Sequence, residues 1–401
     1  MAFDKLKNKR IYGEQIYFIA LSLSLVASFI INTTFMVYFN VKHLNWINYF
    51  SFGLLMIKIF AFDRFNIKQY LSIIIIIFLA VSSWRNTQIN TVMIMFGFIL
   101  GAQGVKFKRI IQQYFRINFS LILLTMLYSL LGIIRNLVFF RENIFRYSLG
   151  IDYPTDLAAY VFYLCLAYCY LNYKKMNLQR WLLILGVALS TYLVTNTRLD
   201  TLLIILIVPT IIIAKRAKAT SNQYLKFIAS SFWYLSVILP YIFILLTVNF
   251  TFSNPIMVKL NQFFSGRLTY GQQGLNSYGI TLFGQKIVEH GWGGIKGLKM
   301  MQQNPFNYFF IDSSFVRMLL INGTIIGMIA FIILISISIH ETFNHDYILP
   351  ACIFLVVLSS IIDQHMLEIT YDPFILSFLS IISKKVNGGF NHDEAKKLYI
   401  G

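Results

Sequence analysis

Seven arginines stand at or beyond the same ends of long apolar segments, where this chain gathers residues that could do chemistry. They are Arg85, Arg135, Arg141, Arg146, Arg198, Arg267 and Arg317. A guanidinium group stays charged at any pH and binds phosphate oxygens in a bidentate way. Fixed arginines in a partly dry cleft would stabilise a pyrophosphate leaving group as its charge develops. The pattern predicts a phosphate or pyrophosphate site held by Arg267 and Arg198, with Arg135 and Arg317 as further substrate-binding residues.

An arginine at the end of an apolar segment can instead anchor a helix among lipid headgroups. We expect Arg141 and Arg146 to be solvated loop charges. For Arg135, Arg198 and Arg267 the anchoring role and the phosphate-binding role both remain open.

A hydroxyl that attacks a substrate needs a general base within hydrogen-bond reach. Asp312 is the main candidate, with Glu289, His290 and Asp152 in reserve. Asp312 also stands just before an expected helix, where Asp and Ser commonly cap the N-terminus, so capping is the alternative. Arg317 follows roughly one turn later and is expected to lower the pKa of Asp312, which would weaken it as a base.

Two further groups of ionisable residues flank apolar segments. Asp152 and Asp156 would share one helical face as a carboxylate pair, although Asp and Pro also mark an ordinary helix start. The second group lies between two apolar segments near the C-terminus and comprises Asp363, His365, Glu368 and Asp372. Its spacing matches no zinc or calcium pattern, so we expect a solvated loop.

A glycine-rich stretch, residues 291–297, lies between the two main candidates Arg267 and Asp312. It lacks the Lys-Ser/Thr of a phosphate-binding P-loop, and its glycines favour tight turns, although its N–H groups could still touch a phosphate. Aromatic side chains nearby could stack on sugar faces or sit in the membrane interface. They are Tyr270, Tyr278, Trp292 and Tyr308.

The composition predicts what positions these residues. Hydrophobic residues make up 57% and charged residues 12%, against about 25% charged in a soluble domain. The chain is therefore predicted to be an all-α polytopic membrane protein forming one integral domain, 1–401. A spanning helix needs roughly 20 apolar residues. The twelve candidates are 16–39, 44–62, 69–84, 88–104, 115–135, 156–172, 181–196, 199–214, 227–250, 314–338, 348–362 and 373–383, of which the last is a candidate re-entrant segment.

The basic residues orient these spans. Clusters at 5–10, 106–109, 174–180, 215–226 and 384–397 all fall on one side when the number of spans is even, and 22 of the 34 basic residues lie there. The positive-inside rule then places both termini in the cytoplasm, and the long loop 251–313 outside the cell. The first span is expected to be a signal anchor. The three cysteines lie inside apolar segments and are expected to be packing residues.

Three segments together resemble the Wzy-like polysaccharide polymerases, which make O-antigen, capsule and exopolysaccharide. Residues 195–201 (TNTRLDT) are similar to a T-x-S/T-R segment of O-antigen polymerases and ligases. Residues 264–268 (FSGRL) with 282–284 (LFG) resemble their S-G-R … L-F-G. Residues 311–315 (IDSSF) with 319–327 (LLINGTIIG) resemble D-N-S-Y … L-L-x-x-G-I-I-G. The resemblance covers mainly 190–330. Ligases carry a histidine where this chain has Asp312, and Ser313 replaces the usual asparagine, which favours polymerase over ligase.

The resemblance implies a GT-C-like fold and a glycosyltransferase that needs no metal and no cofactor. The implied substrate is an oligosaccharide repeat unit on undecaprenyl pyrophosphate at the outer face of the cytoplasmic (inner) membrane. The terminal hydroxyl of one unit would attack the anomeric carbon of the growing chain. Expected partners are the lipid-linked saccharide, the bilayer, and flippase and chain-length regulator proteins. The net charge of +18 lies in the topological clusters and does not indicate nucleic acid.

Three rival functions are weighed against polymerisation. A lipid-linked oligosaccharide flippase should carry charges along a path through its spans, and often repeat symmetry. A polysaccharide ligase shares the leaving group and differs in its acceptor. A sugar acyltransferase would more naturally keep a site that contains histidine.

Overall fold

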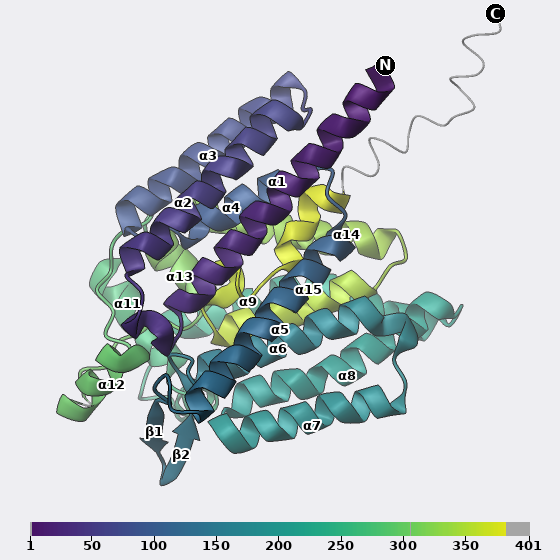
Figure 1. The fold of residues 1–401 in the computed structure, drawn as a ribbon. Coiled ribbons are helices and arrows are strands. Elements are labelled where there is room, and N and C mark those ends of the chain that lie inside the picture. Colours follow the sequence, from purple (N-terminus) through teal and green to yellow (C-terminus); the bar gives the residue numbers. More distant parts are fainter. Residues whose placement is uncertain (1, 305, 382–401) are drawn as a thin grey trace, which may run out of the picture.

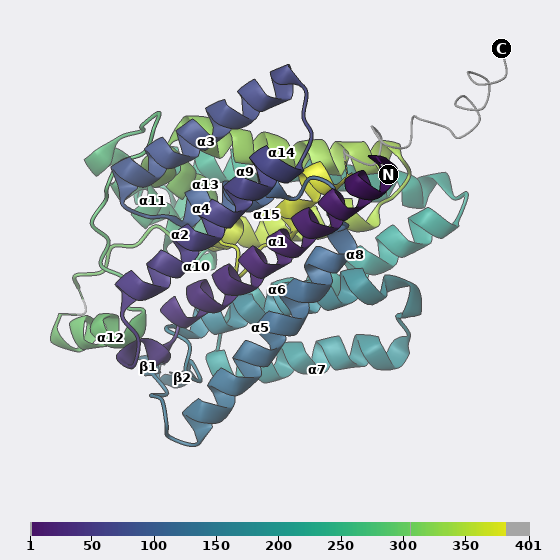
Figure 2. The ribbon, with the colours of Figure 1, turned by 45° about the horizontal axis from the view of Figure 1, so that its top comes forward.

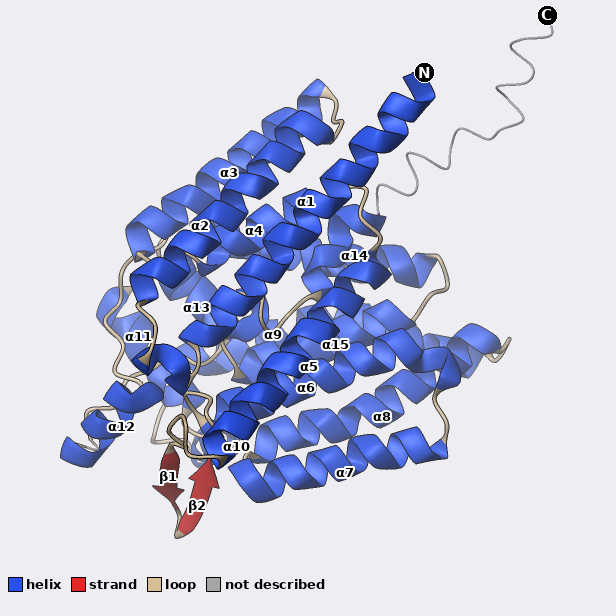
Figure 3. Ribbon diagram, viewed as in Figure 1, coloured by secondary structure: helices blue, strands red, loops and turns tan. Residues whose placement is uncertain are grey.

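The structure, a computed structural model, describes residues 2–304 and 306–381 and is almost entirely helical (Figure 1). Figure 3 shows a single β-hairpin beside the helices. Among the described residues, eight helices are long and apolar enough to cross a membrane, and two shorter apolar helices accompany them. The chain is therefore an all-α, multi-pass membrane protein.

The helices fall into two groups by length. The long ones are α1 (Ala2–Ile31), α2 (Val41–Ile57), α3 (Ile67–Thr87), α5 (Phe107–Leu130), α6 (Pro154–Asn172), α7 (Leu178–Thr195), α8 (Arg198–Ala219), α9 (Gln223–Val248) and α14 (Thr324–Phe343). The shorter ones are α4 (Thr91–Gly101), α10 (Pro255–Phe263), α11 (Arg267–Tyr278), α12 (Gly294–Gln303), α13 (Ser314–Arg317) and α15 (Ile348–Ile362). The antiparallel strands β1 (Val138–Arg141) and β2 (Ile144–Tyr147) form the hairpin.

Each predicted span up to residue 250 overlaps one of these helices, and the predicted span 348–362 coincides with α15. Two predicted boundaries were wrong, and the second changes the place of a candidate residue. The helix α1 ends at Ile31, because a 3₁₀ turn over Thr34–Val37 follows it. The helix α5 ends at Leu130, so Arg135 lies in the turn beyond the helix instead of inside it.

The predicted span 314–338 is broken at Gly323. The short helix α13 continues into a π-helical turn over Met318–Asn322, and α14 then begins at Thr324. Gly323 has φ 99°, a conformation that side chains with a Cβ rarely adopt. A Cβ there would lie 2.5 Å from the backbone N of Gly284. The helix break therefore accommodates the close approach of the segment that contains Gly284.

The predicted span 373–383 extends beyond the described residues. Within them it contains a 3₁₀ turn over Phe374–Leu376 and helical residues up to 381. The basic cluster at 384–397 lies outside the described residues.

The helix α15 lies at the centre of the bundle, where it packs against α6, α8, α9 and α14. Nearly all of its side chains are buried, as are those of α4. The cysteines Cys165, Cys169 and Cys352 are buried in this core, as predicted.

The segments α10, α11, α12 and the hairpin gather at one end of the bundle, which we call the loop end. Figures 1 and 2 show α12, β1 and β2 at the opposite end from the start of α1. Because successive long helices alternate in direction, α7, α9 and α15 finish at the loop end and deliver the residues that follow them there.

Candidate active site

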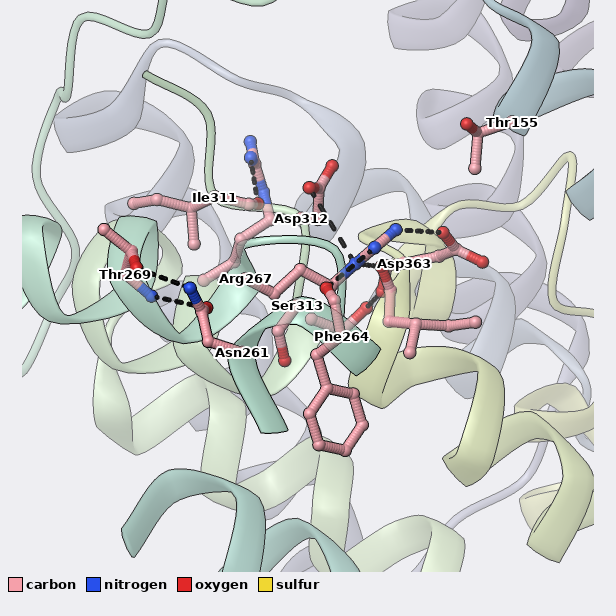
Figure 4. Close-up of polar contacts among 12 residues, drawn as sticks. Thr155, Asn261, Phe264, Arg267, Thr269, Ile311, Asp312, Ser313 and Asp363 are labelled. Atoms are coloured by element: carbon pink, nitrogen blue, oxygen red, sulfur yellow. Dashed lines mark hydrogen bonds and ion pairs between the residues drawn. The ribbon is translucent and has the colours of Figure 1, made fainter. Parts of the chain in front are cut away.

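Arg267 is the first residue of α11 and points into the protein at the loop end. The turn before it, Ser265–Gly266, has φ values of 54° and 87°. Only 9% of the Arg267 side chain is exposed. Its Nε–H donates to the carbonyl oxygen of Ile362, and Nη1 donates to that of Phe264 at 3.1 Å (Figure 4). Two backbone carbonyls therefore fix the guanidinium in one orientation.

Carboxyl groups from separate segments surround this guanidinium. Oδ2 of Asp312 lies 3.8 Å from Nε, and Oδ1 of Asp363 lies 3.6 Å from Nη2. Asp200, on the first turn of α8, faces Asp363 and is itself 2% exposed. Burial lowers the pKa of Arg267, but Asp312, Asp363 and Asp200 outweigh burial and raise it above its usual value. The guanidinium therefore stays charged in this buried position.

The loop that carries Asp312 is joined to the end of α15 by hydrogen bonds. The backbone N–H of Ser314 donates to the Asp363 carbonyl at 3.1 Å, and its hydroxyl donates to the same oxygen at 2.6 Å. The Ser313 hydroxyl reaches the Ser360 carbonyl at 3.4 Å. These contacts fix the distance between the two carboxylates that flank Arg267.

Asp312 is more basic than the sequence predicted. Burial raises its pKa to about 6, and the nearby Asp363 adds to the rise, while Arg267 and then Arg317 lower it. The predicted lowering by Arg317 is present, but the rise in pKa caused by desolvation is larger. The residue before α13 is Ser313, so Asp312 lies one position outside the capping site.

Arg317 supports the Asp312 loop through a different carboxylate. Its Nη1 lies 2.7 Å from Oε1 of Glu289 and donates to the Ile311 carbonyl at 3.0 Å. Glu289 in turn accepts from the Ile311 N–H at 2.9 Å. Arg317 and the reserve base Glu289 thus hold the backbone immediately before Asp312. The other nearby reserve base, His290, pairs through its backbone with Phe309.

The predicted sugar-stacking residues Tyr270 and Trp292 meet through Tyr308. Ring centroids lie 4.9 Å apart for Tyr270 and Tyr308, and 4.5 Å apart for Trp292 and Tyr308. Burial and the neighbouring Asp312 raise the pKa of Tyr308, while Arg267 lowers it. The structure therefore brings Arg267, Asp312 and this aromatic cluster together at the loop end.

Arg198 and Arg135 lie elsewhere. The side chain of Arg198 is 65% exposed, and its Nη2 lies 2.8 Å from Oε2 of Glu142 in the hairpin turn. Arg135 lines a separate cavity, described below. In the segment 195–201 it is Asp200 that faces the Arg267 cluster.

The acidic group near the C-terminus is buried, which corrects the prediction of a solvated loop. Asp363, His365 and Asp372 are at most 4% exposed. Nε2 of His365 lies 3.5 Å from Oδ1 of Asp156, and its Nδ1 lies 3.4 Å from Oε1 of Glu368. Burial lowers the pKa of His365, but Glu368 and Asp156 outweigh burial and raise it to about 10. The imidazole is therefore a buried cation at neutral pH.

Aromatic stacking holds this imidazolium in place. The His365 ring stacks on Tyr371 at 3.6 Å between centroids, and Tyr371 stacks on Tyr160 at 3.9 Å. His365 follows Asp363 by two residues, so its cluster adjoins the Arg267 site. Asp156 faces His365 instead of forming a simple pair with Asp152. Burial raises the pKa of Asp152 to about 7, with Asp156 adding to the rise.

Arg146 is also buried, where the sequence predicted a solvated charge. The residue is 2% exposed, and its Nε donates to the Thr195 carbonyl at 2.8 Å. The guanidinium lies over the Tyr153 ring, 5.5 Å from its centroid. Arg146 thus attaches the hairpin to the end of α7.

The sequence missed Asp200 and Asp363 as members of the Arg267 site. A signal existed for each, because carboxylates at the ends of apolar segments of a membrane protein are costly to bury and tend to be functional. The spacing of these residues gave no sign that Asp200 and Asp363 would converge on Arg267.

The second and third of the segments that carry the family resemblance contact each other. The N–H groups of Thr324 and Ile325 donate to the carbonyls of Thr281 and Leu282 at 2.9 and 3.3 Å. The N–H of Gln285 donates to Ile321 at 3.0 Å. The LFG segment therefore lies against the helix break at Gly323.

Among the described residues, no group of three or more His, Cys, Asp or Glu side chains is arranged to hold a metal ion. No protein-family model, curated protein or solved structure matches this chain. Its function is therefore argued from the site.

Proposed function

We propose that this protein polymerises oligosaccharide repeat units carried on undecaprenyl pyrophosphate, by glycosyl transfer at the outer face of the cytoplasmic membrane. The observation that carries the proposal is the buried Arg267, fixed by two backbone carbonyls, with the Asp312 carboxylate 3.8 Å away. The fixed cation would stabilise the leaving group, and the carboxylate beside it would accept the proton of the attacking hydroxyl.

Arg267 would act on the leaving group. In the reaction the bond between the anomeric carbon and the pyrophosphate oxygen breaks, and the electron pair leaves with undecaprenyl pyrophosphate. A guanidinium that is already oriented stabilises this developing charge without reorganisation. For pyrophosphate to approach, one of its oxygens would replace Asp363 at Nη2 of Arg267, because Nε and Nη1 already donate to backbone carbonyls.

Asp312 would act on the attacking group. The terminal hydroxyl of the second repeat unit forms the new bond to the anomeric carbon and loses its proton to the Asp312 carboxylate. With a pKa of about 6, this carboxylate is mostly ionised at pH 7 and more basic than an exposed one. A base with a pKa near the working pH is the most effective. Tyr270 and Trp292, joined through Tyr308, would bind the sugar rings next to it.

The membrane arrangement follows from the same proposal. The loop end would face outward, both termini would lie in the cytoplasm, and the twelve segments would form a GT-C-like bundle. The basic clusters support this orientation, because the positive-inside rule counts short loops next to spans. The substrate lipid would enter from the outer leaflet, and flippase and chain-length regulator proteins would be its functional partners.

Reconstitution tests the proposal directly. The purified protein in liposomes, given only a lipid-linked repeat unit, should produce a ladder of longer saccharides and release undecaprenyl pyrophosphate. The two products should appear in a ratio of one released carrier per unit added. Transport of the lipid-linked unit between leaflets without elongation would contradict the proposal and favour a flippase.

One observation favours a polysaccharide ligase as the second candidate. Related ligases carry a histidine near the third motif, and here His365 lies beside Asp363, which contacts Arg267. A ligase would release the same pyrophosphate but transfer the chain to a different acceptor. Reconstitution separates the two, because a ligase leaves the lipid-linked unit unextended until that acceptor is added.

A further inference from the structure

A cavity at the loop end is separate from the Arg267 site. It has a volume of about 510 Å³ and lies between the turn after α5 and the helix α12. Its lining residues are Ser129, Gly132, Ile134, Arg135, Asn136, Leu137, Ile295, Leu298, Lys299 and Gln302. The cavity lining includes no residue of the Arg267 cluster, so the cavity is a candidate site for a second ligand.

The charge of this cavity is of one sign. Arg135 enters from the turn and Lys299 from α12, and none of the described lining residues is acidic. Both side chains are exposed. Two cations from separate segments that face one hollow without a carboxylate select an anion, and the guanidinium favours planar or tetrahedral oxyanions such as phosphate.

Further polar groups in the same cavity are suited to phosphate oxygens. Ser129 is 6% exposed, and its hydroxyl has no hydrogen-bond partner among the described residues. Gln302 adds an amide on the α12 side. A buried hydroxyl without a partner is unusual in a folded protein, and a bound oxyanion would provide one.

The rest of the cavity is aliphatic and lies beside surface that suits lipid. Four lining residues are aliphatic: Ile134, Leu137, Ile295 and Leu298. On the same turn, Leu130 and Leu131 are 71% and 64% exposed, and Ile133 is 48% exposed. Leu130 is the last residue of α5, a helix apolar enough to span the membrane, and Leu131 and Ile133 follow it. The cavity therefore opens where a membrane helix ends.

We propose that this cavity binds the phosphate headgroup of an anionic membrane glycerophospholipid. Arg135 and Lys299 would hold the phosphate, the Ser129 hydroxyl would donate to it, and the aliphatic side chains would contact the glycerol and the first part of the acyl chains. The proposal does not rest on the proposed function, because a transporter or a transferase could carry such a site.

The test measures lipid binding to the purified protein by native mass spectrometry. The protein is exchanged into mixed micelles that contain phosphatidylglycerol or phosphatidylcholine. We expect preferential retention of phosphatidylglycerol. The double variant Arg135→Ala/Lys299→Ala should reduce that retention roughly tenfold, since two charge-assisted contacts are lost. Lys296→Ala is the matched control, because Lys296 is an exposed lysine of the same helix that does not line the cavity.

Three results would overturn the proposal. The first is equal retention of the two lipids by the unaltered protein. The second is a loss in Lys296→Ala as large as in the double variant, which would indicate general surface charge. The third is displacement of phosphatidylglycerol by an equal concentration of glycerol phosphate, which would show that the cavity takes a soluble phosphate compound. A failed polymerisation assay would affect none of these readouts.

Discussion

Nε of Arg267 lies 3.8 Å from Oδ2 of Asp312, although Arg267 begins α11 and Asp312 stands near the far end of the segment between α9 and α13. The contact is anchored on both sides. Two carbonyls orient the guanidinium, and Ser314 fastens the Asp312 loop to the end of α15. A cation and a base at a fixed separation are the central feature of this site.

Replacing Arg267 should abolish polymerisation. We expect Arg267→Ala to lower the rate by roughly 100-fold or more, as loss of a fixed charge-stabilising donor commonly does. Arg267→Lys should recover little, because an ammonium cannot match the two-carbonyl, bidentate geometry. Polymer length and membrane abundance are measured together, with Arg141→Ala as the control arginine. Polymer of ordinary length from Arg267→Ala would remove this residue from the mechanism.

The rate should depend on pH through Asp312. Burial raises the pKa of this carboxyl to about 6, and only the ionised form accepts a proton. The rate should therefore rise from pH 5 to 7 and level off above that. Asp312→Asn should lower the rate roughly 100-fold and remove the rising limb, whereas Glu142→Gln, in the exposed hairpin turn, should change neither. A variant Asp312→Asn with the parent pH profile would rule out Asp312 as the base.

His365 should stabilise the protein below alkaline pH. Its pKa is raised to about 10 by Glu368 and Asp156 against the opposing effect of burial. The stabilisation is therefore fully present below the ordinary value near 6.5 and is lost as the pH rises through about 10. His365→Gln should lower the free energy of unfolding at pH 7 by roughly 1–3 kcal/mol, since two partly buried carboxylates lose their cation.

Thermal unfolding at pH 7 and pH 10 measures the His365 effect. The parent protein should lose stability between these values, and His365→Gln should lose less. His43→Gln replaces an exposed histidine and should behave as the parent does. Equal pH sensitivity in all three proteins would show that the charged state of His365 contributes nothing.

The helix break should depend on Gly323. Gly323→Ala places a Cβ 2.5 Å from the N of Gly284 at φ 99°, so the LFG segment has to move. We expect a loss of about 1–3 kcal/mol in stability from the backbone strain alone. Gly186→Ala is the control, because a Cβ there meets nothing within 4 Å, and it should be neutral or stabilising. The thermal unfolding midpoints of both variants test this prediction. Equal midpoints would show that Gly323 is not required for the helix break.

The sequence predicted the class of fold well, because long apolar segments must become buried or spanning helices. Helix ends were less predictable. The ends at Ile31 and Leu130 are set by packing of the next turn, and the break at Gly323 is set by a segment far away in sequence. Neither effect can be predicted from the hydropathy of the neighbouring residues.

The site was predictable in part. Arg267 and Asp312 stood out because charged residues flanking apolar segments were few. A polar stretch between two apolar segments is usually solvated, so the sequence predicts that Asp363 and His365 are exposed. They are buried because α15 lies at the centre of the bundle, and centrality cannot be inferred from one sequence. Arg198 and Asp200 had similar local patterns, and only the rotation of α8 separates the exposed arginine from the buried carboxylate.

The central claim is tested most directly by the lipid-linked saccharides of cells that lack this protein, with their position across the membrane. We predict that single repeat units on undecaprenyl pyrophosphate accumulate on the outer face. Repeat units trapped on the cytoplasmic face, or full-length polymer stranded on its carrier, would contradict a polymerase and identify a flippase or a ligase respectively.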